Sequence, residues 1–444
     1  MRILSLTLSA ALVTCLFAVT ATAQIIETPT SVKPIGFTHD YYEVNQPAEE
    51  SPSDDVVPEV ENGGGCDGCC DACGCDDGGC CSSCDCCSGC CCCYLFGPCE
   101  PFSIGQIGCC GPTIGGWISM GYHAQPTPLS QANGDLLAFN DVPNGLRAHQ
   151  VWMYMEKEAC ASCCSWDWGY RIDFMYGTDA QKTQAFGNAA LGATGGGWDA
   201  GWDNGIYGWA MPQAYVELAR GDLSVIVGHF FTIVGYEVVT APDNFFYSHA
   251  LTMFNSEPFT HTGVLASYQA SNATKVFAGW TQGWDTAFFR NNNGASSYLG
   301  GFSHDISNNV NFTYITTAGN FGARGSQAYS HSMVFSFQMT DRLEYVVQSD
   351  LVQVGAGAPV GTSASQVGIN QYTFYTVSDC VKLGFRNEWW KSGDNSFHEA
   401  TFGVNIKPHA NLTIRPEIRH DWSPAIATQA AARWIFGIDA IMTF

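Results

Sequence analysis

Charge is scarce in this chain. Only 13% of its 444 residues are Asp, Glu, Lys or Arg, about half the share that soluble globular proteins usually carry. Basic residues are the scarcest, since 18 Lys and Arg stand against 41 Asp and Glu and give a formal net charge of −23. We expect no nucleic-acid partner, because binding to phosphate backbones needs a basic surface.

Long hydrophobic runs are missing as well. Beyond the first residues, no stretch approaches the ~18 apolar residues that a membrane-spanning helix needs, and the mean hydropathy is −0.01. This argues against a helical membrane bundle. The hydrophobic share of 46% argues equally against a wholly disordered chain. If the mature chain enters a membrane, it must do so with β-strands.

Two common hydrolase signatures are also absent. The sequence has no Gly-x-Ser-x-Gly elbow, and its 11 His residues form no His-Glu-x-x-His pattern. We expect no enzyme activity and no cofactor.

The first 23 residues have the pattern of a secretory signal peptide. Arg2 supplies the positive charge, Leu4 to Val19 form a short uncharged apolar run, and Ala21-Thr22-Ala23 offers small residues for cleavage. Export would place the mature chain in an oxidising compartment, where disulfides persist.

An acidic and then Cys-rich front follows. Residues 24–61 are an acidic linker that contains proline, and residues 62–112 are expected to be an irregular periplasmic segment. Of the 22 Cys, 14 lie between Cys66 and Cys93, while Lys33 is the one basic residue of 24–112.

Three roles remain open for the Cys-rich segment. It could form disulfides or cross-links to envelope proteins, it could bind a thiolate-loving metal of unknown identity, or it could be a spacer. We favour disulfides, because four further Cys lie in predicted turns on the same side of the protein. The candidates are Cys66, Cys69, Cys70, Cys73, Cys75, Cys160, Cys163, Cys164 and Cys380.

Residues 113–444 show the alternation of β-strands that have one apolar face. In 412–422, Leu412, Ile414 and Ile418 alternate with Arg415, Glu417, Arg419 and Asp421. The same period predicts about 16 strands. Their expected ranges are 115–123, 146–158, 165–176, 209–220, 223–236, 263–271, 274–284, 297–306, 310–319, 329–339, 343–353, 368–377, 380–390, 397–407, 412–422 and 433–444.

The connections between these segments alternate in length. Links such as 221–222, 272–273 and 340–342 are tight, whereas 124–145, 177–208 and 237–262 are long. Outer-membrane barrels have short periplasmic turns and long outer loops, and a soluble sandwich has no reason to alternate in this way. We therefore predict an all-β fold, a closed transmembrane antiparallel barrel of about 16 strands over 113–444.

The C-terminus resembles the insertion signal of bacterial outer-membrane barrels. Apolar residues occupy every second position up to the last one, and a barrel-insertion machinery is therefore an expected partner. The residues of this signal are Phe436, Ile438, Ala440, Met442 and Phe444.

At several places the sequence resembles the family called "Putative beta-barrel porin-2, OmpL-like". The resemblance rests on Trp209-Ala210-Met211-Pro212-Gln213, on the run from Val227 to Glu237, on Glu257-Pro258-Phe259-Thr260-His261, and on Asn411 to Glu417. It covers about 113–444. It implies an outer-membrane barrel with the role of a pore.

The third long loop, 237–262, follows the fifth strand, and the corresponding loop of general porins folds into the lumen. Phe245, Phe246, Tyr247, Phe254 and Phe259 suggest a packed loop. We predict that it is the constriction, with its acids facing basic side chains across the lumen. The predicted pore-lining residues are Arg171, Asp173, Glu217, Glu237, Asp243, Glu257, Arg386, Arg415, Glu417, Arg419 and Asp421.

These observations predict an outer-membrane porin for passive diffusion of small hydrophilic solutes or ions, surrounded by outer-membrane lipid. The alternative is a structural envelope protein whose barrel anchors the Cys-rich segment. A homo-oligomer is left open, because porins often form trimers and this sequence carries no sign of one.

Overall fold

The computed structural model describes most of the predicted barrel region. The described residues are 102–106, 111–125, 138–159, 165–185, 199, 201, 203–288, 294–356, 365–424 and 432–444. Among them, no helix is both long and apolar enough to cross a membrane. The predicted signal peptide, the linker and the Cys residues between 66 and 93 lie outside this part of the chain.

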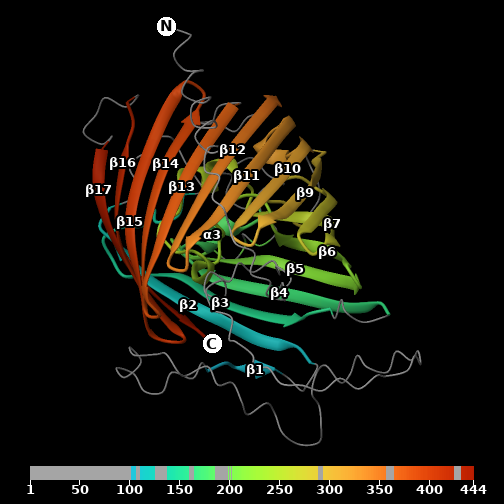
Figure 1. The fold of residues 1–444 in the computed structure, drawn as a ribbon, viewed down its shortest axis with the longest axis horizontal. Coiled ribbons are helices and arrows are strands. Elements are labelled where there is room, and N and C mark those ends of the chain that lie inside the picture. The colour runs from blue at the N-terminus through green and yellow to red at the C-terminus, as the bar shows by residue number, and fades with distance from the viewer. Residues whose placement is uncertain are drawn as a thin grey trace, which may run out of the picture. The chain divides into compact units, whose positions relative to one another are not determined.

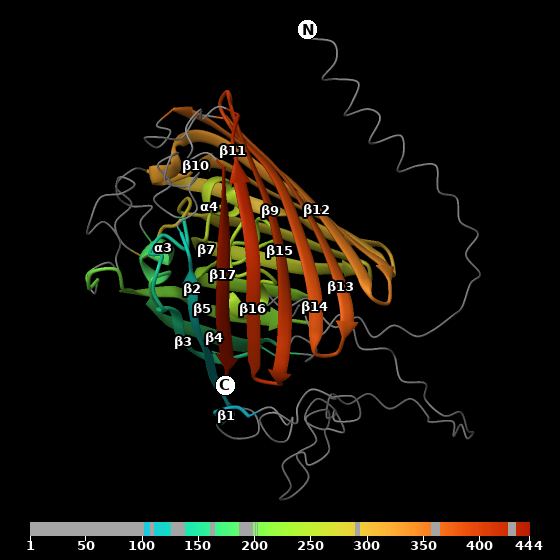
Figure 2. The same ribbon diagram turned by 90° about the vertical axis from the view of Figure 1, so that its left-hand side faces the viewer.

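Strands β2 to β17 form a closed antiparallel barrel of 16 strands (Figures 1 and 2). Consecutive strands pair throughout, and β17 closes the ring on β2 with Ile438 opposite Tyr122. The strands are β2 (Thr113–His123), β3 (Arg147–Lys157), β4 (Asp167–Gly177), β5 (Gly208–Arg220), β6 (Leu223–Phe231), β7 (Thr260–Ser271), β8 (Thr274–Thr281), β9 (Ser296–Ser307), β10 (Val310–Asn320), β11 (Ser326–Thr340), β12 (Leu343–Ala356), β13 (Ser365–Ser378), β14 (Val381–Ser392), β15 (Asn395–His409), β16 (Leu412–Trp422) and β17 (Ala432–Thr443).

The prediction of about 16 strands is confirmed, with two strands that end earlier than expected. The segment predicted as 223–236 ends at Phe231, and the one predicted as 274–284 ends at Thr281. Gly235 and Gly283 have φ of +94° and Asp285 has φ of +54°, a left-handed conformation that cannot continue a strand. In both places the chain turns away from the wall into a loop.

The barrel has a turn end and a loop end. At the turn end, pairs such as Gly221-Asp222 and Ala410-Asn411 join the strands, whereas links such as 178–207 and 232–259 occupy the loop end. The alternation is not perfect, because β14 and β15 are joined at the loop end by Gly393-Asp394 alone. Strand length varies from 8 residues in β8 to 15 in β11 and β15.

The chain just before the barrel is attached to the turn end. The short strand β1 (Gly105–Gln106) pairs with the start of β2. The backbone N–H of Phe102 donates to Asn411 Oδ1 over 2.9 Å, and Asn411 Nδ2 donates to the Phe102 carbonyl over 2.8 Å. Phe102, the first of the described residues, therefore lies beside the β15–β16 turn.

The outer surface of the barrel is apolar. Large hydrophobic side chains on it are 39% to 48% exposed, among them Phe174, Val216, Val264, Phe385, Phe402, Ile418 and Phe436. Their neighbours along the strands point inward and are buried and polar, among them Asp173, Arg386, Thr401 and Arg419. An apolar outside and a polar inside are the two faces of a transmembrane barrel.

This assignment of the two faces predicts unequal costs for a new charge. Phe402→Arg should destabilise the barrel by about 2–4 kcal/mol, since it places a guanidinium against lipid. Ser336→Arg, on the inner face of β11 at a partly exposed position, should cost much less. Equilibrium unfolding of both variants in lipid bilayers measures the difference, and equal losses would contradict the assignment.

Candidate functional site

The long link between β6 and β7 lies inside the barrel. This inner loop (residues 232–259) contains the 3-10 helix η5 (Ala241–Asp243) and the helix α4 (Leu251–Ser256), and α4 appears within the ring of strands in Figure 2. Residues 244–259 are all buried. The expectation that this loop is packed and folds into the lumen agrees with the structure.

Glycines on the inner wall make room for the aromatic part of the inner loop. A Cβ on Gly384 would lie 2.2 Å from the ring of Phe245, and one on Gly437 would lie 2.8 Å from the ring of Tyr247. In register, Gly384 pairs with Gly403, Gly403 pairs with Glu417, and Glu417 pairs with Gly437. The glycines therefore form a level row in which the rings approach the backbone of the wall.

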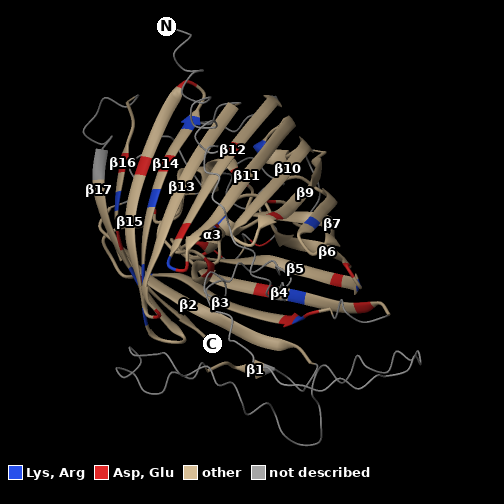
Figure 3. Ribbon diagram, in the orientation of Figure 1, with Lys and Arg blue, Asp and Glu red and all other residues tan. Residues whose placement is uncertain are grey.

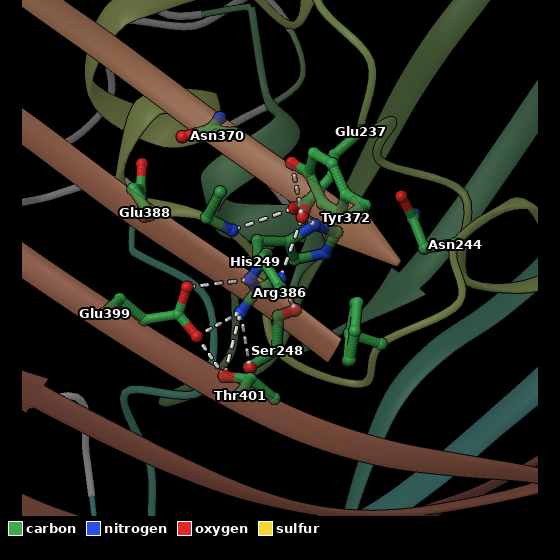
Figure 4. A network of polar contacts seen from close by, with 12 residues as sticks. Glu237, Asn244, Ser248, His249, Asn370, Tyr372, Arg386, Glu388, Glu399 and Thr401 are labelled. Atoms are coloured by element: carbon green, nitrogen blue, oxygen red, sulfur yellow. Dashed lines mark hydrogen bonds and ion pairs between the residues drawn. The ribbon is translucent and has the colours of Figure 1, made fainter. Parts of the chain in front are cut away.

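Arg386 on β14 is the centre of a polar network between wall and loop (Figure 4). Its Nη1 donates to Glu237 Oε1 over 2.8 Å and to the Ser248 carbonyl over 2.7 Å, and its Nε donates to Glu399 Oε2 over 2.9 Å. The Tyr372 hydroxyl also donates to Glu237. The guanidinium is fully buried, and its hydrogen bonds to Glu237 and Ser248 join the wall directly to the loop.

Two further arginines on β16 bind carbonyls of the loop. Arg415 forms a bidentate pair with Asp439, at 2.9 and 2.7 Å, and its Nη1 donates to the carbonyls of Ala241, Asn244 and Phe246. Arg419 pairs with Asp421 at 2.7 Å and donates to the His249 carbonyl over 2.5 Å.

Carboxylates of the wall bind the N–H groups of the same loop. Glu417 accepts from the N–H groups of Tyr247 and Ser248, at 3.0 and 3.2 Å. Glu388 accepts from the N–H groups of Leu251 and Thr252, both at 2.6 Å, at the start of α4. These bonds satisfy backbone groups that would otherwise be buried without partners.

The end of the inner loop is held by a third contact. Arg324, in the 3-10 helix η6 (Gly322–Arg324), donates to the carbonyls of Asn255 and Glu257 at 3.3 and 3.2 Å. Its partner Asp285 accepts from the Phe259 N–H over 2.7 Å. Residues of the strands and of the β8–β9 and β10–β11 links thus bind the inner loop along its length.

The structure brings some of the predicted pore-lining residues together and separates others. Glu237 touches Arg386, whereas the sequence led us to expect these charges to face each other across water. Arg171 pairs with Asp173 and Glu156 on its own wall, at 2.8 and 3.1 Å, and not with the loop. Direct contact is what burial demands, because a guanidinium without a partner is costly inside a protein.

The other predicted residues take different places. Glu257 accepts from Gln348 Nε2 over 2.6 Å, Asp243 accepts from the Thr240 hydroxyl, and Glu217 accepts from the Ser224 hydroxyl. Asp243 and Glu217 are partly exposed, unlike the buried arginines. A role in lining a pore stays a prediction for the whole set.

Several residues of this site were missed at the level of sequence. Glu156, Glu388, Glu399 and Asp439 each bind one of the arginines or the loop. Asp439 could have been found, because it alternates with the apolar face of the last strand. The same alternation places Glu156, Glu388 and Glu399 on the inner faces of their strands. Their partners needed the register between strands, which no single-sequence pattern contains.

The two glutamates of the inner loop have opposite electrostatic surroundings. Burial would raise the pKa of Glu237, but Arg386, His249 and the Ala250 N–H lower it to about 2. Burial raises the pKa of Glu257 well above its ordinary 4.5, and the neighbouring Asp350 carboxyl raises it further. These surroundings therefore favour the anion of Glu237 and the protonated form of Glu257.

Most of the predicted disulfide positions lie outside the described residues. Cys380 is the exception, and it is buried beside the β13–β14 turn, where its carbonyl accepts from the Lys407 N–H over 2.8 Å. Within the described ranges, no three His, Cys, Asp or Glu side chains are grouped so that they could hold a metal ion.

The sequence profile of the family "Putative beta-barrel porin-2, OmpL-like" matches residues 111–444, and the chain belongs to this family. It is a porin-type barrel protein, and its closed barrel with a loop inside is the architecture of an outer-membrane channel. No curated protein matches the sequence.

Several solved structures are similar to this chain at low sequence identity. The outer membrane channel DcaP of Acinetobacter baumannii has a TM-score of 0.50 and 10% identity, and the alignment covers 77% of this chain and 100% of that one. A mutant porin of Rhodopseudomonas blastica gives 0.46 and 9%, covering 75% and 100%. OmpT of Vibrio cholerae in its trimer form gives 0.45 and 10%, covering 75% and 99%.

Removal of the central guanidinium should release the inner loop. Arg386→Met leaves Glu237 and Glu399 buried without their cation, which should cost about 3–5 kcal/mol. We expect new proteolytic cleavage within 232–259 and a lower melting temperature. Lys391→Met, at a partly exposed position of the same strand, is the control. Equal cleavage and equal melting temperatures in the two variants would argue against a role of Arg386 in holding the loop.

The two glutamates should give the melting temperature opposite pH dependences. A lowered pKa means that the contribution of Glu237 is present above pH 4.5 and is lost as the pH falls toward 2. A raised pKa means that the contribution of Glu257 declines as the pH rises beyond 4.5.

Thermal unfolding of Glu237→Gln and Glu257→Gln between pH 2 and 8, in detergent, measures both effects. Glu237→Gln should flatten the acid side of the profile, and Glu257→Gln should raise the melting temperature near neutral pH. Profiles of unchanged shape in both variants would show that neither group is coupled to folding.

Proposed function

We propose that this protein is an outer-membrane diffusion pore for small hydrophilic solutes or ions, narrowed by the inner loop. The observation that supports this most is the attachment of the inner loop to the inner face of the wall. The loop binds β12, β14 and β16 through the side chains of Gln348, Arg386, Glu388, Arg415 and Glu417. Gln150 on β3 also binds its backbone, at the Val239 carbonyl and the Ala241 N–H. A barrel of 16 strands is wide enough for an aqueous channel, so a loop held inside it sets the width.

Some inner residues of β3 and β5 are not covered by the inner loop. Tyr154 and Glu156 on β3 and Tyr215 and Glu217 on β5 are partly exposed, although they alternate with residues of the apolar outer face. We infer that solutes pass between these strands and the inner loop.

Planar-bilayer recordings test the proposal. The purified protein should give stable, ohmic single-channel steps, and a variant in which residues 243–257 are replaced by a short Gly-Ser linker should give larger steps. The deletion removes the segment that fills the lumen, so an unchanged conductance would show that the inner loop does not define the narrowest point. A folded barrel without any steps would overturn the pore.

A second role is suggested by the attachment at the turn end. Because Phe102 is hydrogen-bonded to Asn411 and β1 is paired with β2, we propose that the barrel also anchors the Cys-rich front to the envelope. Mass spectrometry of non-reduced peptides should then find disulfides among the Cys residues of 62–112. Free thiols throughout would remove this role and leave the pore untouched.

A further inference from the structure

We propose that the outer face of β12 to β14 binds a second copy of this chain, and that the amides of Gln371 and Asn387 form hydrogen bonds across a two-fold axis. The inference goes beyond the proposed pore, because it concerns the lipid side of the wall and not the lumen. It follows from the position of polar side chains on a face that is otherwise apolar.

Gln371 on β13 and Asn387 on β14 point to the outside of the barrel. Gln371 is exposed and Asn387 is partly exposed. Successive side chains of a strand point to opposite faces, and the neighbours of both residues are buried on the inner face. These neighbours are Asn370, Tyr372, Arg386 and Glu388.

The two amides stand halfway along their strands. Gln371 is the seventh of the 14 residues of β13, Asn387 is the seventh of the 12 residues of β14, and the two pair in register. Ser349, the seventh of the 14 residues of β12, is a further polar residue on this face. The ends of a spanning strand reach the two water interfaces, so its middle crosses the hydrocarbon layer.

Much of the remaining wall has apolar side chains at this height. Outward residues near the middle of their strands are Ile172 on β4, Val216 on β5, Val227 on β6, Phe402 on β15, Ile418 on β16 and Ile438 on β17. β13 also has no charged residue along its whole length (Figure 3). Polar contact at β13 therefore depends on amides and hydroxyls and not on ion pairs.

Both amides keep hydrogen-bonding groups that point toward lipid. The Tyr345 hydroxyl donates to Gln371 Oε1 over 2.9 Å. Among the described residues, no partner binds Gln371 Nε2 or the side chain of Asn387. Lipid tails offer neither donors nor acceptors, and a polar group without a partner is costly in hydrocarbon. We therefore expect another protein surface to cover this face.

A second copy of the chain has the groups that these amides need. A carboxamide contains donors and an acceptor, so two copies of the same patch complement each other. A ring of three barrels would need two different surfaces on each barrel, whereas a two-fold contact uses one surface twice. The two-fold axis stands along the membrane normal, because both barrels are inserted in the same direction.

The residue beside Asn387 leaves room for this approach. Ala400 on β15 pairs with Asn387 in register and is partly exposed on the outer face. Small side chains let two membrane-embedded surfaces come close enough for polar side chains to bond. The contact then extends from β12 to β15, with β13 opposite β13 of the second copy.

The oligomeric state of the full chain, with reductant present, tests the proposal. Sedimentation equilibrium in detergent and native mass spectrometry from lipid nanodiscs should find a dimer. Gln371→Leu and Asn387→Leu combined should raise the dissociation constant about tenfold, because they remove the hydrogen bonds between the copies. Leucine suits a lipid-facing position, so this variant should keep its heat-modifiable gel migration as a sign of folding.

Two steric variants give an independent comparison. Ala400→Trp places a large side chain beside Asn387 and should prevent the dimer. Ala266→Trp is the matched control, since Ala266 is the seventh of the 12 residues of β7 and is partly exposed on the outer face. It should leave the dissociation constant unchanged.

A photo-reactive benzoyl-phenylalanine in place of Gln371 should cross-link to β13 of a second copy and give a product of twice the mass. A monomeric or trimeric wild type, or a dimer with an unchanged dissociation constant in the double Leu variant, would overturn the proposal. Cross-links to lipid or to another protein alone would also overturn it. None of these measurements uses conductance, so the proposed pore is tested separately.

Discussion

The contact between buried guanidinium groups and backbone carbonyls determines how the interior of this barrel is organised. Arg386 on β14 and Arg415 and Arg419 on β16 bind the carbonyls of one loop, while carboxylates of the same wall hold them in place. Because most of the recognised atoms belong to the backbone, the loop follows the wall with few charged side chains of its own, Glu237 and Glu257 among them. Its side chains are then free to be aromatic and to fill the row of glycines.

This arrangement gives the charged residues of the lumen a structural task, whereas the sequence alone predicts that they line a pore. The charged ladder 415–421 predicts a polar lumen, and one expects ions to meet it. In the structure these charges are buried and hold the loop. Glu156 on β3, Glu217 on β5 and Asp243 in the inner loop are instead partly exposed. Most of these charges hold the loop, and a smaller set of acids is partly exposed.

The fold could be predicted from the sequence because a barrel strand repeats one simple pattern. The alternation in 412–422 and the unequal links gave the number of strands and the direction of each face. The early end of β6 was not predictable, since Ile233 and Val234 continue the apolar pattern while the backbone at Gly235 has already turned. The site was predicted as a set of charges but not as contacts, because the pairing of Arg386 with Glu237 joins residues 149 positions apart.

The attachment of Phe102 to Asn411 also concerns the closure of the ring. Asn411 Nδ2 donates to the carbonyl of Thr443 as well as to that of Phe102, and β1 lies along the start of β2. The first and the last strand of the barrel meet at this place, where the N–H of Phe444 donates to the carbonyl of Gly116. The segment that contains Phe102 and β1 is therefore bonded to both sides of the junction between β17 and β2. A force applied to the chain N-terminal to Phe102 would therefore act on the β17–β2 junction, where the ring is closed.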